Sequence, residues 1–129
     1  MRIALVLLSL LEGVIFAVTA FVVLKKRSVF PDTRVGFHTA QATQSEAAWT
    51  CANNTAGKVC LAGACALLAL AAVLLWTDLE KPVALLLFFA VSVLAVLAAL
   101  LLPICLLRKK QRSSSTVGKQ DDTAYHPKK

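Results

Sequence analysis

The sequence predicts an all-α integral membrane bundle of three transmembrane helices, with a short interfacial helix before the second span. Apolar residues make up 58% of the chain and the mean hydropathy is +0.72, which leaves too little polar surface for a soluble domain of 129 residues. The apolar residues are gathered in three runs of membrane-crossing length, with basic clusters at their ends. We therefore expect one membrane domain over residues 1–107 and a tail over residues 108–129.

The first apolar run covers residues 3–24. Its 22 residues reach about 33 Å as a helix, enough to cross a hydrocarbon core of roughly 30 Å. A cleaved signal peptide is the alternative, because Val18-Thr19-Ala20 resembles a cleavage site. The apolar core of a signal peptide is only about 7–15 residues long. Because this run continues to the basic Lys25-Lys26-Arg27, a retained span is favoured.

Glu12 lies in the middle of this span. A carboxylate at that depth costs roughly 3 kcal/mol on insertion scales. The 15 Ile, Leu, Val and Phe residues of the run return about 0.3–0.6 kcal/mol each, so insertion still wins. Glu12 should face other helices rather than lipid. Its role stays open between a polar contact for a ligand or a proton and a hydrogen bond to Ser9, Thr19 or a residue of another span.

Residues 25–58 form the first loop, the part of the chain richest in distinct polar side chains. Thr43-x-x-Glu46 is a capping-box pattern, which predicts that a helix starts there. One face of that helix is marked by Trp49, Ala52, Ala56 and Cys60. We expect an interfacial helix over residues 43–56, with Trp49 at the membrane surface, before the chain turns into the bilayer at Gly57-Lys58.

Two further spans follow the loop. Residues 59–76 are short for a span, about 27 Å, and rich in small side chains that let helix backbones approach closely in lipid. This run is expected to be the central helix, with a dimerisation face as the alternative. The short link 77–82 forces the third span, residues 83–107, to run antiparallel to the second. The Ser-rich, charged residues 108–129 predict a disordered basic tail in the cytoplasm.

The basic residues predict the orientation. The first loop holds five Lys or Arg residues, the link between the second and third spans holds one, and the start of the tail holds four. The positive-inside rule then places the loop and the tail in the cytoplasm and the amino terminus outside. The same placement explains the net charge of +7 without nucleic-acid binding, for which no module is recognisable.

No catalytic constellation, cofactor motif or metal-ligand spacing is recognisable in the sequence. The cysteines show no C-x-x-C pairing and are interpreted as reduced thiols packed as small hydrophobes: Cys51, Cys60, Cys65 and Cys105. His38 has no nucleophile motif near it and is interpreted as a polar loop residue. We therefore predict a protein that is not an enzyme and needs neither a cofactor nor a metal.

The loop carries a recognisable pattern: Gly36-Phe37, Thr39, Ser45-Glu46, Trp49, Ala52-Asn53 and Gly57-Lys58. Over roughly residues 35–63 it resembles the SdpI-like family of bacterial membrane proteins, named for immunity to a secreted toxic peptide. His38 departs from the pattern, since the family usually has Arg there, and Ala40-Gln41 replace a Pro-aromatic pair. The resemblance implies a multi-pass protein of the bacterial plasma membrane that protects the producing cell. One version of the hypothesis adds a relay of the toxin's presence to a cytoplasmic regulator.

The binding candidates are the residues of this pattern and one intramembrane residue: Gly36, His38, Thr39, Ser45, Glu46, Trp49, Asn53, Gly57 and Glu12. The loop residues have an equally open structural role, as a hydrogen-bonded cap on the bundle mouth. A small transporter subunit using Glu12 for proton coupling and an accessory subunit held by the second span are the alternative functions. Expected partners are the lipid bilayer, a peptide toxin and a cytoplasmic regulator, and homo-oligomerisation stays open.

Overall fold

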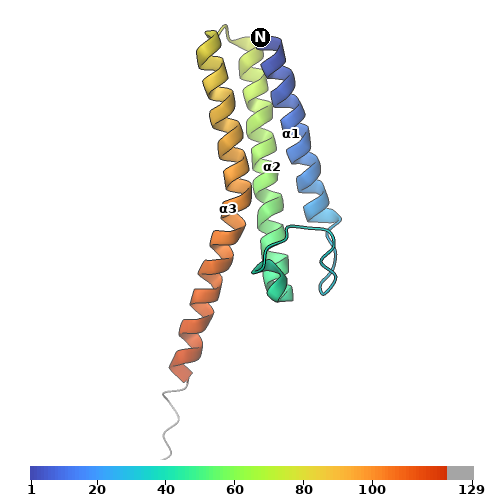
Figure 1. Cartoon of the computed structure of the whole chain (residues 1–129), viewed down its shortest axis with the longest axis vertical. Helices are drawn as coiled ribbons and strands as arrows, with labels where there is room; N and C mark the ends of the chain where they lie inside the picture. Colours follow the sequence, from blue (N-terminus) through green and yellow to red (C-terminus); the bar gives the residue numbers. More distant parts are fainter. Residues whose placement is uncertain (122–129) are drawn as a thin grey trace, which may run out of the picture.

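The computed structural model is an all-helical bundle. It describes the backbone through Asp121 and the side chains through Ser113, and residues 122–129 lie outside the described part. Three long helices, α1 (Arg2–Lys25), α2 (Glu46–Trp76) and α3 (Lys81–Asp121), are joined by a loop with one 3-10 turn, η1 (Ala42–Gln44), and by a short link (Figure 1). All three helices contain a segment long and apolar enough to cross a membrane. The predicted all-α bundle of three membrane-length helices is therefore confirmed.

The predicted interfacial helix is not confirmed as a separate element. Ser45 rather than Thr43 caps α2, and its Oγ accepts the backbone N–H of Ala48 at 3.2 Å. The Thr43 hydroxyl instead donates to the Thr39 carbonyl at 3.2 Å, within η1. From Glu46, α2 continues unbroken through Gly57 to Trp76. The predicted face of Trp49, Ala52, Ala56 and Cys60 therefore lies on one continuous helix, and all four residues are buried.

The third helix is longer than the predicted span. It begins at Lys81 and continues to Asp121, through residues that we expected to be disordered. Extending a formed helix is far less costly than starting one. The Arg, Lys and Gln residues that follow Leu107 are also good helix formers, which favours this continuation. The rest of the predicted tail, residues 122–129, lies outside the described residues.

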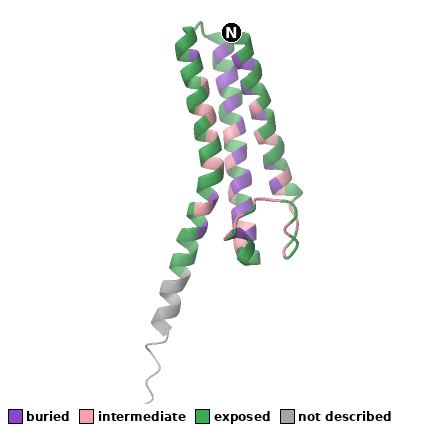
Figure 2. Cartoon of the chain, viewed as in Figure 1, coloured by how far each residue is buried: buried purple, intermediate pink, exposed green. Residues whose placement is uncertain are grey.

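The central position of α2 organises the packing. It packs against both α1 and α3, whereas α1 and α3 contact each other little. Figure 2 shows buried residues following the length of α2. Close approach to α1 depends on glycine: a Cβ at Gly57 would lie 2.5 Å from Leu24 Cγ, and one at Gly63 would lie 2.9 Å from Phe16 Cδ1. Small residues allow this spacing between helices in lipid.

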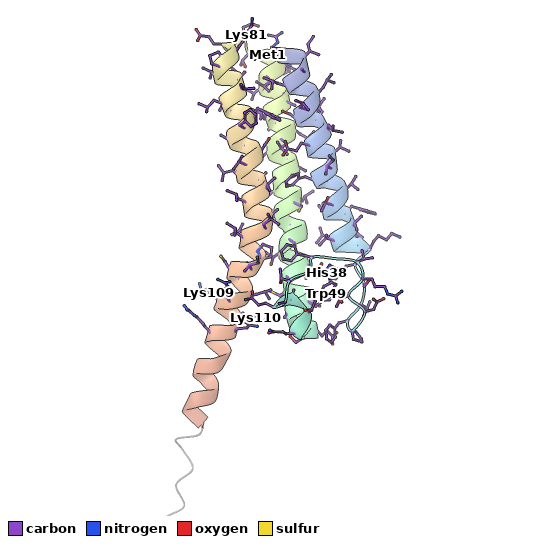
Figure 3. The ribbon with its side chains drawn as sticks, in the orientation of Figure 1. Met1, His38, Trp49, Lys81, Lys109 and Lys110 are labelled. Carbon is purple, nitrogen blue, oxygen red and sulfur yellow. The ribbon has the colours of Figure 1, made fainter. Side chains whose placement is uncertain are left out.

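The two ends of the bundle differ in character. At one end lie the amino terminus and the α2–α3 link, where Arg2 forms an ion pair with Asp78 (Figure 3). At the other end lies the loop between α1 and α2, which contains His38. Trp49 of α2 and Lys109 and Lys110 of α3 lie at the same end. Buried apolar clusters close both ends, around Leu74 at the first and around Trp49 at the second.

We expect Gly57→Val to lower the thermal stability of the purified chain, because the new side chain would enter the space of Leu24. Overpacking of this kind costs about 1–3 kcal/mol. Ala62→Val is the matched control, since Ala62 is exposed on the outer face of α2. The measurement is thermal unfolding in detergent micelles, followed by circular dichroism. Equal melting temperatures for the two variants would contradict the close packing of α1 on α2.

Candidate functional site

The loop between α1 and α2 folds back onto the first turns of α2, at the end of the bundle opposite the amino terminus (Figures 1 and 3). Residues 26–45 make up this segment, which we call the docked loop. Its two arms are held together near their ends, where the Ser28 N–H donates to the Val35 carbonyl at 2.9 Å and the Val35 N–H donates to Ser28 Oγ at 3.0 Å. The docked loop is therefore an ordered part of the fold.

Trp49 joins the docked loop to α2 and α3. Its indole Nε1 donates to the Ser28 carbonyl at 2.9 Å, and the side chain is only 1% exposed. Ala42 of the loop and Leu107 of α3 belong to the same buried cluster. Trp49 is therefore buried between the loop, α2 and α3, and its expected place at the membrane surface stays a prediction.

Asn53 lies one turn after Trp49 and is fully buried. Its Nδ2 donates to the Trp49 carbonyl at 2.8 Å, and its Oδ1 accepts the backbone N–H of Phe37 at 2.6 Å. The two residues thus hold the loop at separate points, Ser28 and Phe37, from one face of α2. We call Trp49 and Asn53 the clamp.

Gly36 lets the docked loop approach the clamp. Its φ of +146° is a conformation that residues with a side chain rarely adopt. A Cβ at this position would also lie 2.9 Å from the Trp49 ring and would collide with Asn53 Oδ1. The loop pattern therefore needs glycine here for two independent reasons.

His38 covers the edge of the clamp while remaining exposed itself. Its ring stands edge-on to Trp49, with the ring centroids 5.3 Å apart. Nδ1 lies 2.7 Å from the Gly36 carbonyl oxygen, and Nε2 contacts the Thr33 carbonyl. Both neighbours are acceptors, so His38 acts as a donor within the loop. Of the predicted residues, Gly36, His38, Trp49 and Asn53 are therefore brought together in one contact network.

The remaining predicted residues have separate places. Thr39 Oγ1 accepts the N–H of Ala42, the first residue of η1, at 3.1 Å, and Ser45 caps α2. Glu46 is exposed in the first turn of α2, where its negative charge interacts favourably with the positive end of the helix dipole. Gly57 lies against Leu24 of α1. These four residues shape the backbone around the clamp.

An apolar groove opens beneath the docked loop. It measures about 300 Å³ and is lined by residues of all three helices, with Gly36 and Phe37 at its loop end. Several of its walls are exposed to the outside of the bundle, including Ile15, Thr19 and Leu100. The Thr19 hydroxyl donates to the Ile15 carbonyl at 2.8 Å, so the groove surface is almost wholly apolar. Such a surface suits a hydrophobic occupant that arrives from the lipid.

Glu12 is hydrogen bonded to another helix. Ser92 Oγ of α3 donates to Glu12 Oε2 at 2.6 Å, and the carboxyl group is half-buried. The partner is thus a residue of another span, one of the two roles that the sequence left open. Ser9 is fully buried, and its hydroxyl has no partner among the described residues. The described residues also hold no group of three or more His, Cys, Asp or Glu arranged for a metal, and the four cysteines are free thiols.

Sequence reasoning missed Ser28 and Leu107, and it named Phe37 as part of the loop pattern but not among the binding candidates. Ser28 and Phe37 meet the clamp through backbone groups, which have no side-chain signature. Leu107 looks like any other apolar residue of the third span. Two polar contacts between segments were also missed, Arg27 to Asn54 and Gln111 to Gln44, the second at 2.9 Å.

We expect Asn53→Ala to release the docked loop. The change leaves the Phe37 N–H without its acceptor, and an unpaired buried donor costs about 1–3 kcal/mol. Trypsin should then cleave after the exposed Arg34 roughly tenfold faster, as resolved by mass spectrometry of the purified chain. Ala47→Ser is the control, because Ala47 is exposed in the first turn of α2. The same cleavage rate in all three proteins would rule out the clamp.

Comparison with known proteins identifies the loop pattern. A sequence model of the SdpI/YfhL protein family matches residues 29–106, a range that takes in most of the docked loop, all of α2 and the membrane part of α3. No curated protein and no solved structure matches the chain. Because the family match covers more than half of its length, and because the clamp and the groove's loop end lie within that match, the chain belongs to the SdpI/YfhL protein family.

Proposed function

We propose that this chain is an immunity protein of the bacterial plasma membrane, which binds a secreted antimicrobial peptide within the bilayer. The observation that carries the proposal is the position of the family-patterned loop: Gly36 and Phe37 form one end of an apolar groove that opens between α1 and α3. A membrane-active peptide that has entered the lipid would meet this groove from the side. Holding the peptide there would keep it from assembling elsewhere in the membrane.

The size of the groove favours side chains over a whole peptide. Ligand sites range over about 300–1,000 Å³, and this groove, at about 300 Å³, lies at the lower limit. A peptide helix lying along α1 and α3 would place a few apolar side chains inside, as in other helix-in-groove interactions. The clamp supports this role indirectly, because it fixes the backbone of Phe37 at the groove's end.

The orientation follows from charge in this proposal. Through Ser113, the loop end of the bundle carries nine Lys and Arg residues against two acidic residues, and the opposite end carries two of each. The positive-inside rule then favours a cytoplasmic docked loop and an external amino terminus. The groove would lie in the inner half of the bilayer. The exposed His38 and Arg34 would be accessible to a cytoplasmic regulator that senses the bound state.

Reporter fusions test this orientation. Alkaline phosphatase fused after Leu79, in the α2–α3 link, should be active because the link is external. The same enzyme fused after Lys129 should be inactive, and green fluorescent protein at that position should fluoresce. Activities measured in intact cells, normalised to the amount of fusion protein, decide the matter. The reverse pattern would place the docked loop outside and contradict a cytoplasmic regulator.

A groove-filling variant tests immunity. In a sensitive host challenged with a panel of purified secreted peptide toxins, Thr19→Trp should lower the tolerated toxin concentration about tenfold, because the indole fills the groove. Val18→Trp is the matched control, since Val18 is 56% exposed and does not line the groove. Membrane levels of both variants are checked by immunoblot. Equal protection by wild type and Thr19→Trp would argue against binding in the groove.

A small transporter subunit is the second candidate, and Glu12 is the observation that favours it. It is the single charged side chain within the three predicted spans, and it connects α1 with α3. Absence of protection against every peptide, with the wild-type chain correctly inserted, would favour this candidate. An accessory subunit held by α2 is less favoured, because Gly63 already packs against Phe16 and Ala95 within the bundle.

A further inference from the structure

We infer that Glu12 and Ser92 form a polar recognition site that pairs with a basic side chain of a membrane-inserted peptide. The inference rests on the proposed function for the peptide's place in the groove. It adds a chemical requirement that the apolar walls do not impose: a Lys or Arg at mid-membrane depth. The argument uses the position, the contacts and the surroundings of the Glu12 carboxyl group.

Glu12 is isolated in charge and deep in the membrane. The predicted spans 3–24, 59–76 and 83–107 contain no other charged residue. Within α1, Glu12 lies about 15 Å along the helix from Arg2 and about 20 Å from Lys25. A carboxylate at this depth is costly and usually finds a partner. The described part of the bundle offers no cation at that level.

Its contacts leave acceptor capacity unused. Ser92 Oγ donates to Oε2 at 2.6 Å, and no other described residue donates to the carboxyl group. A carboxylate offers about four acceptor positions on its two oxygens. Ser9, about one turn before Glu12, does not donate to it, since its hydroxyl has no partner among the described residues. The Glu12 side chain is half-buried and so remains partly accessible from outside the bundle. In lipid no water completes its hydrogen bonds, so a further donor from a partner is favoured.

The carboxyl group also lies at the end of the groove away from the loop. Ile15 and Phe16 follow Glu12 by about one helical turn, Val96 follows Ser92 by one turn, and all three line the groove. A peptide helix that fills the groove with apolar side chains would therefore place the side chain one turn further along at the level of Glu12. The occupant to which we commit is a peptide with a basic residue at that position.

Charge complementarity selects the basic residue. A Lys or Arg at mid-membrane depth carries an insertion cost like that of Glu12, and pairing the two charges reduces both costs. The apolar stem of such a side chain packs against the groove walls while its charged head reaches the carboxylate. A second copy of this chain is a poorer occupant, because it would bring two Glu12 side chains of like charge together.

The test uses two synthetic probes with the full chain in vesicles of phosphatidylcholine and phosphatidylglycerol. Each probe is a Leu/Ala helix of membrane-spanning length, one with a central Lys and one with a central Leu. Association is measured by energy transfer from the labelled chain to the labelled peptide. We expect the Lys peptide to bind wild type at least about tenfold more strongly than the Leu peptide. Glu12→Gln, which keeps the shape, should remove this preference, and Ser92→Ala should reduce it.

Two results would overturn the inference. The first is equal binding of the two peptides to wild type, or a Lys preference that survives in Glu12→Gln. The second is energy transfer between two copies of the chain that is lost in Glu12→Gln, without any Lys preference, since Glu12 would then join two copies. The toxin challenge in cells tests the proposed function independently of this site. A Lys preference in vesicles without protection in cells supports the Glu12 site and counts against the immunity function.

Discussion

The buried amide of Asn53 is the interaction on which the loop end of this protein depends. It accepts from one backbone group and donates to another while fully buried, so both halves of the amide are satisfied away from water. In a low-dielectric setting such a network is stabilising only when complete, because an orphaned group there is costly. The loop is therefore held in one arrangement. The Trp49 hydrogen bond to Ser28, the close approach of Gly36 and the burial of Leu107 against Trp49 occur at the same end of the bundle.

The clamp also explains how a departure from the family pattern is accommodated. His38 is the residue at which the loop departs from the pattern of the resemblance, and it faces two backbone carbonyls, those of Thr33 and Gly36. A guanidinium group has five N–H donors, and an imidazole ring has fewer, but both can donate to carbonyl oxygens. A hydrogen-bond donor at this position therefore joins two parts of the loop beside Trp49. Hydrogen bonds from residue 38 to these carbonyls hold the loop and do not distinguish one ligand from another.

The sequence was a good guide to the helices and to half of the site. Run length and hydropathy suffice for three spans, because lipid leaves helices as the main solution for an apolar run of that length. The start of α2 was harder, since Thr43 and Ser45 are both capping residues, and the choice depends on the Thr39 carbonyl that binds the Thr43 hydroxyl. That hydrogen bond spans only four residues, but the capping pattern by itself does not distinguish the two helix starts.

The partners of the site residues were beyond sequence reasoning. Trp49 and Asn53 stand out by residue type, but Ser28 and Phe37 contribute a carbonyl and an N–H that every residue possesses. The Glu12–Ser92 bond joins residues 80 positions apart, and no periodicity links them. Such pairs are set by how α1 and α3 are placed against α2.

The family match begins after α1, so α1 and the matched segment contribute different parts of the groove. Residues 29–106 contain the clamp, the loop end of the groove and the α3 wall, whereas α1 supplies the opposite wall and the Glu12 carboxyl group. None of the clamp's hydrogen bonds involves a residue of α1. The family-matched segment thus anchors its own loop, and α1 is fitted to it by separate contacts, Leu24 against Gly57 and Phe16 against Gly63. An exchange of α1 between relatives would therefore have to keep side chains that fit opposite Gly57 and Gly63.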